Sequence, residues 1–147
     1  MKIDNENKNK LAIVVVGYNR IDSIKRILTS LDNAVYPCDV PLVISIDCSG
    51  CEPLYDYVRN YTWNHGCKFV IIREKRMGLR DHVLSCGDLT KFFRGVIILE
   101  DDIFVSPYFY YYSLACVDKY DSDDRVSGIS LYRPAMDGNL PIDYSYS

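Results

Sequence analysis

Three consecutive acidic residues, Glu100-Asp101-Asp102, are the part of this sequence whose types and spacing best suit chemistry. They follow Gly95 to Leu99, a short apolar run that predicts a buried strand. Adjacent carboxylates repel one another, and near a core they need a positive partner. Carboxylates suit Mg²⁺ or Mn²⁺, which commonly bind one or two of them together with substrate phosphates. The triplet predicts a divalent-metal site for a nucleotide diphosphate, with a polar strand exit or helix cap as the alternative.

Three other segments carry polar residues at the points where apolar strands are expected to end. They are Gly17-Tyr18-Asn19-Arg20, Asp47-Cys48-Ser49-Gly50 and the run from Arg73 to Gly78. In an open parallel sheet the carboxyl ends of the strands share one edge, and ligands bind in the crevice outside that edge. All four segments are therefore expected to open onto one crevice. Four polar segments at one crevice favour a site for a metal and a nucleotide more strongly than any single motif does.

The elements that must position these segments alternate along the chain. Apolar runs rich in β-forming residues predict strands at 11–16, 41–46, 67–72, 96–99 and 126–131. Segments with helical spacing of apolar residues predict helices at 21–31, 52–65, 79–93 and 107–120. Alternating strands and helices predict an α/β domain with a mostly parallel sheet covered on both faces. Strands buried on both faces are continuous apolar runs, as these are.

The composition narrows the classes of protein. A chain of 147 residues is long enough for one domain with a real core, and its net charge of −3 gives no sign of a nucleic-acid partner. No apolar run approaches the roughly 20 residues of a transmembrane segment. Residues 1–10 are polar, unlike a secretory signal, and are expected to form a flexible lead. We therefore expect a cytoplasmic protein, peripheral to the inner membrane face if its acceptor is lipid-linked.

The six cysteines are expected to be free thiols, because the chain has no secretory signal and enough apolar residues for a core. Cys48 and Cys51 have C-x-x-C spacing, but no second pair of Cys or His residues follows to complete a zinc site. The run Tyr108 to Tyr112 is expected to divide between core and half-buried surface, since consecutive helical residues point in different directions. Asp121 to Asp124 is expected to be a turn rather than a second metal site.

Three motifs in order, Val14 to Arg20, Ser45-Ile46-Asp47 and Leu99 to Asp102, resemble glycosyltransferases of the GT-A fold. The similarity extends from about Leu11 to about Leu131. It is greatest to the N-acetylglucosaminyltransferase I type, whose metal motif is also Glu-Asp-Asp, among family-2-like nucleotide-sugar transferases. The resemblance implies the GT-A fold of nucleotide-diphospho-sugar transferases, a three-layer α/β/α sandwich.

The resemblance also implies roles by position. Asp102 would be the direct metal ligand, and Glu100 and Asp101 would contact ribose, sugar hydroxyls or metal-bound water. Asp47 would accept a hydrogen bond from uracil N3–H; a simple turn residue is the alternative. His82 would lie near the diphosphate, with an exposed or core histidine as the alternative. The remaining nucleotide-binding positions would be Gly17, Tyr18, Asn19 and Arg20 in the first loop, and Arg76, Gly78 and Leu79 in a loop that closes over the nucleotide.

The implied activity is metal-dependent transfer of a hexosyl or N-acetylhexosaminyl group from a UDP-linked sugar to a saccharide or glycan acceptor, with Mn²⁺ or Mg²⁺ as cofactor and inverting chemistry. Members of this family continue well beyond the metal motif, and the later part supplies the acceptor surface and the catalytic base. Here 45 residues follow Asp102. Residues 11–147 are therefore expected to form a single donor-binding domain that lacks part of the acceptor-binding half, and no residue is assigned as the base.

Three alternatives remain open. A nucleotidyltransferase would carry a Gly-rich basic loop after its first strand, which Gly17-Tyr18-Asn19-Arg20 matches poorly. A non-catalytic module that binds nucleotide sugars is favoured by the short segment after Asp102. A flavodoxin-like regulatory or interaction domain would show no metal-dependent nucleotide binding. Titration with UDP in the presence and absence of Mn²⁺ separates this last alternative from the nucleotide-binding ones.

Overall fold

The computed structural model describes residues 5–131, and residues 132–147, which the sequence analysis included in the domain, lie outside this range. The described elements, in chain order, are the 3-10 helix η1 (Asn5–Asn9), β1 (Leu11–Gly17), α1 (Ile21–Asp32), β2 (Leu42–Ile46), α2 (Glu52–Asn60), β3 (Lys68–Ile72), α3 (Leu79–Gly87), the 3-10 helix η2 (Asp88–Lys91), β4 (Gly95–Glu100) and α4 (Phe109–Tyr120).

Within the described residues the sheet has four strands in the order β3-β2-β1-β4, and every neighbouring pair is parallel. Val15 is paired with Ile44 of β2 on one side and with Leu99 of β4 on the other. All residues of β1 and β2 are buried, as expected for central strands covered on both faces. The predicted α/β class with a parallel sheet is thereby confirmed.

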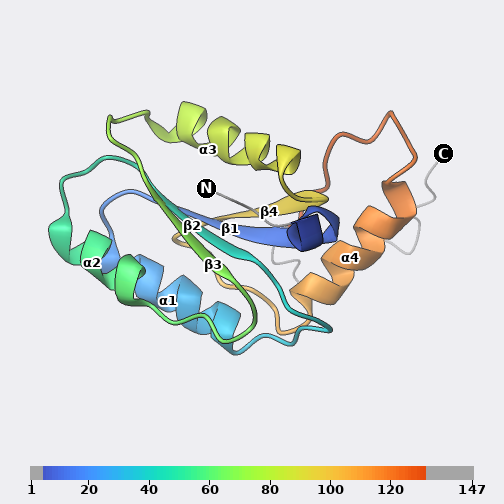
Figure 1. Cartoon of the computed structure of the whole chain (residues 1–147), viewed down its shortest axis with the longest axis horizontal. Coiled ribbons are helices and arrows are strands. Elements are labelled where there is room, and N and C mark those ends of the chain that lie inside the picture. Colours follow the sequence, from blue (N-terminus) through green and yellow to red (C-terminus); the bar gives the residue numbers. More distant parts are fainter. Residues whose placement is uncertain (1–4, 132–147) are drawn as a thin grey trace, which may run out of the picture.

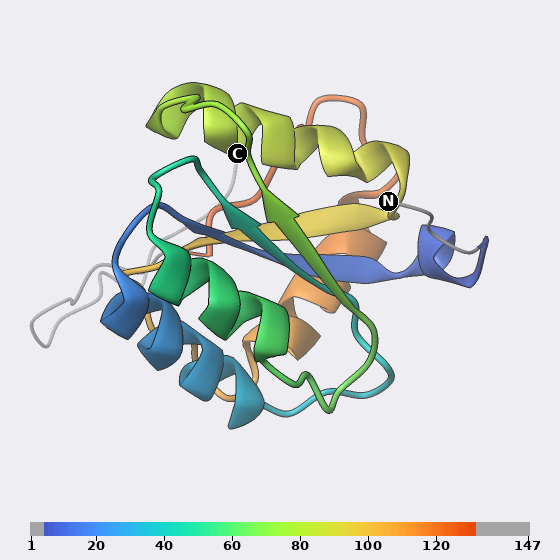
Figure 2. The same cartoon turned by 60° about the vertical axis from the view of Figure 1, so that its left-hand side comes forward.

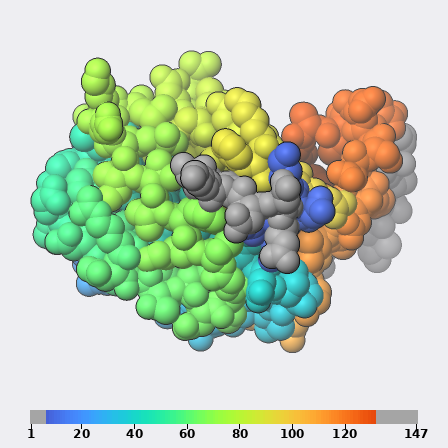
Figure 3. Space-filling model, in the orientation of Figure 1, coloured from blue at the N-terminus to red at the C-terminus, as the bar shows by residue number. Residues whose placement is uncertain are grey.

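Helices cover both faces of this sheet, which gives three layers (Figures 1 and 2). On one face α1, α2 and α4 pack through buried residues such as Leu28, Leu54 and Tyr110. On the other face α3 and the segment after it bury Cys86 and Phe93 against β1 and β2. In the space-filling view, α4 and the segment that follows it (orange) stand to the right of the α3 layer (yellow-green), as Figure 3 shows.

The carboxyl ends of all four strands lie at one edge, on the left of Figure 1. At this edge β1 ends at Gly17, where any side chain would force Ile24 to shift. A Cβ on Gly17 would lie 2.6 Å from Ile24 Cδ1 and 3.1 Å from Ile46 Cδ1. Glycine therefore lets the start of α1 and the end of β2 close tightly around the end of β1, and this packing places the following loop, Tyr18 to Arg20, at the mouth of the crevice.

Several predicted elements differ from the structure. The strand predicted at 126–131 is wrong: residues 127–131 are exposed, and no strand ladder of the described sheet includes them. Their apolar and β-branched residues favour extended backbone, but a strand also needs a neighbouring strand to pair with. The helix predicted at 79–93 is shorter, because α3 ends at Gly87 and a 3-10 helix follows to Lys91. Residues 5–9, expected in a flexible lead, form η1.

The second predicted helix also ends early, at Asn60 rather than His65. Tyr61 has extended backbone (φ −60°, ψ 134°), which stops the helix. Lys68 Nζ then donates to the carbonyls of Val58 (3.0 Å) and Arg59 (2.8 Å), so a side chain from β3 satisfies carbonyls that the helix leaves without partners. The other predicted bounds agree with the structure within two residues.

Three other expectations, on the cysteines, the aromatic run and residues 121–124, are confirmed. All six cysteines, which lie within the described residues, are free. Phe109 and Tyr110 are buried, whereas Tyr108, Tyr111 and Tyr112 are exposed, so the aromatic run divides between core and surface. Residues 121–124 form turns. Among the described helices, none is both long and apolar enough to cross a membrane.

Candidate functional site

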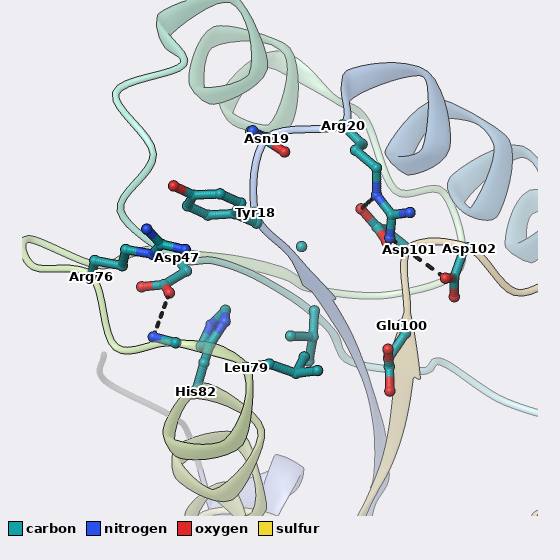
Figure 4. Close-up of a pocket in the computed structure, with 13 residues that line it drawn as sticks. Tyr18, Asn19, Arg20, Asp47, Arg76, Leu79, His82, Glu100, Asp101 and Asp102 are labelled. Carbon is teal, nitrogen blue, oxygen red and sulfur yellow. Dashed lines mark hydrogen bonds and ion pairs between the residues drawn. The ribbon is translucent and has the colours of Figure 1, made fainter.

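A pocket of about 430 Å³ opens at the carboxyl edge of the sheet (Figure 4). Its walls come from the segments after β1, β2, β3 and β4, which are far apart in the sequence. Every residue that the sequence analysis assigned to the site lines it, and Val16 is the one lining residue that was not assigned. The lining residues are Val16, Gly17, Tyr18, Asn19, Arg20, Asp47, Arg76, Gly78, Leu79, His82, Glu100, Asp101 and Asp102.

The acidic triplet lies at the end of β4, and its members have different surroundings. Asp101 is buried, whereas Glu100 is exposed and the Asp102 side chain is 52% exposed. Arg20, from the first loop, donates to both oxygens of Asp101, with Nε 3.2 Å from Oδ2, and its Nη2 lies 3.5 Å from Asp102 Oδ2. The positive partner expected for the triplet is therefore Arg20, which contacts Asp101 and Asp102. The hydrogen bond to Asp101 raises the pKa of the guanidinium.

This arrangement also tests whether the residues suit a divalent cation. Asp101 is occupied by Arg20, which leaves Glu100 and Asp102 as the exposed carboxylates of the triplet that line the pocket. Within residues 5–131 no group of three or more His, Cys, Asp or Glu side chains could hold a metal by itself. The donor set fits an ion held by one carboxylate, with phosphate oxygens and water as its other ligands, an arrangement usual for Mg²⁺. The predicted metal ligand therefore suits a site that the substrate completes.

Asp47, at the end of β2, has a structural role that the sequence analysis missed. Its carboxylate is buried and accepts backbone N–H groups from Cys48 (2.8 Å), Met77 (2.9 Å) and Gly78 (3.0 Å). Burial raises the pKa of Asp47, but these hydrogen bonds and the nearby His82 lower it more, so the pKa lies below its usual range. The carboxylate is ionised at neutral pH and ties the segment before α3 to the end of β2.

His82 is a core histidine that also lines the pocket. It is 2% exposed, and a hydrogen bond of 2.7 Å links its Nε2 to the hydroxyl of Ser45 on β2. Burial lowers the pKa of His82, Arg73 lowers it further, and Asp47 opposes them, with a net shift below the usual value. His82 is thus neutral at pH 7, and any contact with a diphosphate would be a hydrogen bond from a neutral ring.

Tyr18 and Arg76 meet across the pocket mouth from the first and third loops. The guanidinium carbon of Arg76 lies 5.0 Å from the centre of the Tyr18 ring, a cation–π arrangement. Figure 4 shows these two side chains beside Asp47, whereas Asp101 and Asp102 lie on the other side of the pocket. One end of the pocket therefore holds an aromatic ring, a guanidinium and the Asp47 carboxylate, and the other end holds the acidic triplet with Arg20.

Two residues of this site could not be identified from the sequence. Ser45 is a buried hydroxyl in the middle of an apolar strand, and Met77 contributes only its backbone N–H. The one available signal was the serine itself, because a buried hydroxyl needs a partner. Nothing in residue type or spacing indicates that Met77 donates to Asp47.

Comparison with known proteins identifies the fold. No family model matches the chain, and no curated protein matches it in sequence. The crystal structure of S. aureus TarS, a glycosyltransferase, superposes with a TM-score of 0.57 at 20% identity over 83% of this chain. A structure of TarS 1-349 in complex with UDP superposes with a TM-score of 0.51 at 18% identity over 77% of this chain.

This chain covers 23% of the first of these solved chains and 34% of the second. It therefore spans about a quarter of the first and about a third of the second. At this level of identity the likeness concerns the fold. The described residues thus have an α/β fold of the GT-A type, with the pocket at the carboxyl edge of its parallel sheet.

Proposed function

We propose that this chain binds a UDP-linked sugar, together with Mn²⁺ or Mg²⁺, as the donor site of a glycosyltransferase. The observation that carries the proposal is one pocket in which a half-exposed carboxylate, Asp102, and an aromatic–basic pair, Tyr18 and Arg76, occupy different sides. Such a pocket suits a ligand with a planar base at one end and a metal-bound diphosphate at the other. Structures of the fold's relative TarS 1-349 in complex with UDP and with UDP-GlcNAc support the choice of ligand.

The residues have distinct parts in this proposal. Asp102 would hold the cation, which supplies positive charge beside the diphosphate leaving group. Arg20 adds a guanidinium at the same end, held in place by Asp101. Asp47 is the ionised acceptor nearest Arg76 and Tyr18 in Figure 4, and would read the N3–H of uracil. His82, neutral and fixed by Ser45, would offer a hydrogen bond but no charge.

The complete reaction would be attack of a saccharide hydroxyl on the anomeric carbon of the donor, helped by a general base. The donor sugar is proposed to be a hexose or an N-acetylhexosamine. No pocket residue is assigned as the base: Asp47 and Asp101 already accept hydrogen bonds from protein groups, Asp102 is proposed to hold the cation, and Glu100 is proposed to contact ribose, sugar hydroxyls or metal-bound water. A second candidate function is a nucleotide-sugar binding module without transfer activity of its own, because no residue of the described pocket is assigned as the base.

Calorimetric titration with UDP, in the presence and absence of Mn²⁺, tests the donor site. We expect saturable binding that tightens when Mn²⁺ is added. Asp124→Ala is a matched control, because Asp124 is an exposed aspartate in the turn after α4, remote in sequence from the pocket segments. The absence of any heat of binding with UDP and Mn²⁺ would overturn the proposal and leave the flavodoxin-like interaction domain as the better interpretation.

A further inference from the structure

Ser45 and His82 form a buried hydrogen-bonded pair between β2 and α3. Ser45 Oγ lies 2.7 Å from His82 Nε2, although the two residues are 37 positions apart in the sequence. Both side chains are buried. β2 is a central strand that pairs with β1 on one side and β3 on the other. Ser45 is therefore a rigidly held group against which the ring of His82 is oriented.

The burial of this pair decides which partner donates. A serine hydroxyl can donate one hydrogen and accept others, whereas each nitrogen of a neutral imidazole is either a donor or an acceptor. Within residues 5–131, His82 Nε2 is the hydrogen-bond partner of the Ser45 hydroxyl. If Nε2–H donated, the hydroxyl hydrogen would be buried without an acceptor, which costs more than an unused lone pair. The Ser45 hydroxyl therefore donates to Nε2.

The tautomer of His82 follows from the direction of this hydrogen bond. Burial lowers the pKa of His82, so the ring is neutral at pH 7 and carries a single N–H. When Nε2 accepts, that proton is on Nδ1, because the hydrogen bond made by one ring nitrogen sets the state of the other. An imidazolium would also carry a proton on Nε2 and would lose the bond that Ser45 donates. The pair thus selects the neutral Nδ1–H form.

Nδ1–H is the polar group that His82 can offer to a ligand. His82 lines the pocket, where Figure 4 shows its ring rising from α3, and Ser45 already uses its Nε2. Within residues 5–131, Nδ1 is not among the buried polar side-chain atoms that lack a partner, as expected for an atom that reaches the pocket. A donor at this position suits an acceptor oxygen of a ligand and does not suit another N–H group.

We propose that Ser45 is a positioning residue that holds His82 in the Nδ1–H tautomer, so that His82 donates one hydrogen bond to an acceptor oxygen of the bound nucleotide. The identity of that ligand, a uridine nucleotide, rests on the proposed function. The tautomer rests only on the geometry of Ser45 and His82. Ser45 is not one of the residues that line the pocket, so it acts on the ligand through the ring of His82.

Nitrogen-15 NMR of the ring nitrogens tests the tautomer in the ligand-free protein at neutral pH. The chain has two histidines, so His65→Gln assigns the His82 signals by difference. We expect a protonated Nδ1 and an unprotonated Nε2 in the parent. In Ser45→Ala, Nε2 loses its donor, and the signals should shift toward the Nε2–H form that an unconstrained imidazole favours. A protonated Nε2 in the parent, or the same tautomer in parent and Ser45→Ala, would overturn the proposal.

Two further variants distinguish the hydroxyl from packing. Ser45→Thr keeps the hydroxyl on a side chain that suits a strand and should restore the parent tautomer. If its added methyl group prevents folding, Ser45→Cys, with a weak S–H donor, should give an intermediate ratio of tautomers. Ser113→Ala is the matched control, because Ser113 is also buried but donates to Phe109 O within α4. A shift of the His82 signals in Ser113→Ala as large as in Ser45→Ala would overturn the assignment to Ser45.

Titration with UDP and Mn²⁺ tests the effect on binding. Ser45→Ala should weaken UDP binding by roughly 2- to 10-fold, the range for one hydrogen bond, and Ser45→Thr should restore the parent affinity. His82→Asn, whose amide nitrogen can take the place of Nδ1, should bind UDP more tightly than His82→Gln, whose amide extends toward the Nε2 position.

The outcomes separate this inference from the proposed function. Parent affinity in Ser45→Ala despite a changed tautomer, or the opposite order of the two His82 variants, would overturn the role in binding and leave the proposed function standing. If the parent does not bind UDP, the proposed function and the hydrogen bond to the nucleotide both fail, while the NMR signals of the ligand-free protein still report whether Ser45 sets the tautomer.

Discussion

Arg20 Nη2 lies 3.5 Å from Asp102 Oδ2, so the carboxylate assigned to the metal already has a protein cation beside it. The same guanidinium donates to both oxygens of Asp101, whose side chain is 5% exposed against 52% for Asp102. The two aspartates therefore differ in role. Asp101 holds Arg20 in place, and the exposed carboxylate of Asp102 remains accessible from the pocket. Repulsion within the acidic triplet is offset before any ligand arrives.

Asp102→Ala should abolish most of the effect of Mn²⁺ on UDP binding while the fold is retained. Loss of an outer-shell partner of a metal typically weakens its binding about 10- to 100-fold, and loss of a direct ligand should do at least as much. Removing one of three adjacent negative charges should not destabilise the metal-free protein. Calorimetry with UDP and Mn²⁺, paired with thermal unfolding, measures both effects. If the variant binds UDP and Mn²⁺ as tightly as the parent, Asp102 is not the ligand.

The parent protein should bind UDP more tightly than CDP, by roughly tenfold or more. Cytosine presents an acceptor where uracil has N3–H, and an acceptor facing the buried Asp47 carboxylate costs about 1–3 kcal/mol. Asp47→Asn should narrow this preference, because an amide can donate to cytosine. Competition titrations of the parent and the variant with both nucleotides measure the gap.

The hydrogen bonds from Asp47 to the segment before α3 give a control for that result. Asp47→Asn also weakens the hold on Met77 and Gly78, so affinity for both nucleotides should fall to some extent. If the affinities for UDP and CDP fall equally and the preference is unchanged, the role of Asp47 is to hold Met77 and Gly78 and not to read the base. Equal affinities of the parent for UDP and CDP would remove the uracil assignment.

His82 should make the protein less stable as the pH falls. Its pKa is lowered in the folded state, mainly by burial, so the unfolded chain takes up a proton on His82 at a higher pH than the folded chain does. Stability from this residue is therefore full above the unfolded value of about 6.5 and is lost as the pH drops below it. Replacing His82 with Gln should flatten that part of the pH–stability curve.

Urea unfolding of the parent and His82→Gln between pH 5 and 8 measures the difference. Comparing the two curves isolates His82 from His65, which is present in both proteins. Asp47, whose pKa is also lowered, contributes stability that is lost only at a lower pH, as the pH falls through its folded pKa. Parallel curves for parent and variant over this range would contradict a buried, neutral His82.

Residues 1–147 alone should transfer little or no sugar, although they bind the donor. Loss of general-base help lowers a rate by about 10²- to 10⁴-fold, and loss of acceptor positioning forfeits effective molarities of about 10⁵ M or more. Slow hydrolysis of the sugar nucleotide by water is the activity expected to remain. Measuring UDP release from UDP-sugars with and without saccharide acceptors tests this; robust, saturable transfer would refute it and place a base within residues 121–143.

The sequence by itself determined the parts of this protein that depend on local pattern. Continuous apolar runs and helical spacing predicted the four strands and four helices of the described fold, with two helices extended too far. The rule that parallel strands end at one edge brought together the polar residues after β1, β2, β3 and β4. The pattern of apolar residues and the polar residues that follow each strand can both be identified from sequence, because each is carried by residues close together in the chain.

Tertiary structure alone decided which of these polar groups hold one another. Arg20 binds Asp101, Asp47 binds the N–H groups of Met77 and Gly78, and Ser45 binds His82. Each pair joins segments far apart in sequence, and backbone donors such as Met77 N–H have no residue signature. The predicted strand at 126–131 failed for the same physical reason: strand propensity is local, but pairing requires a neighbour that only the folded chain can supply.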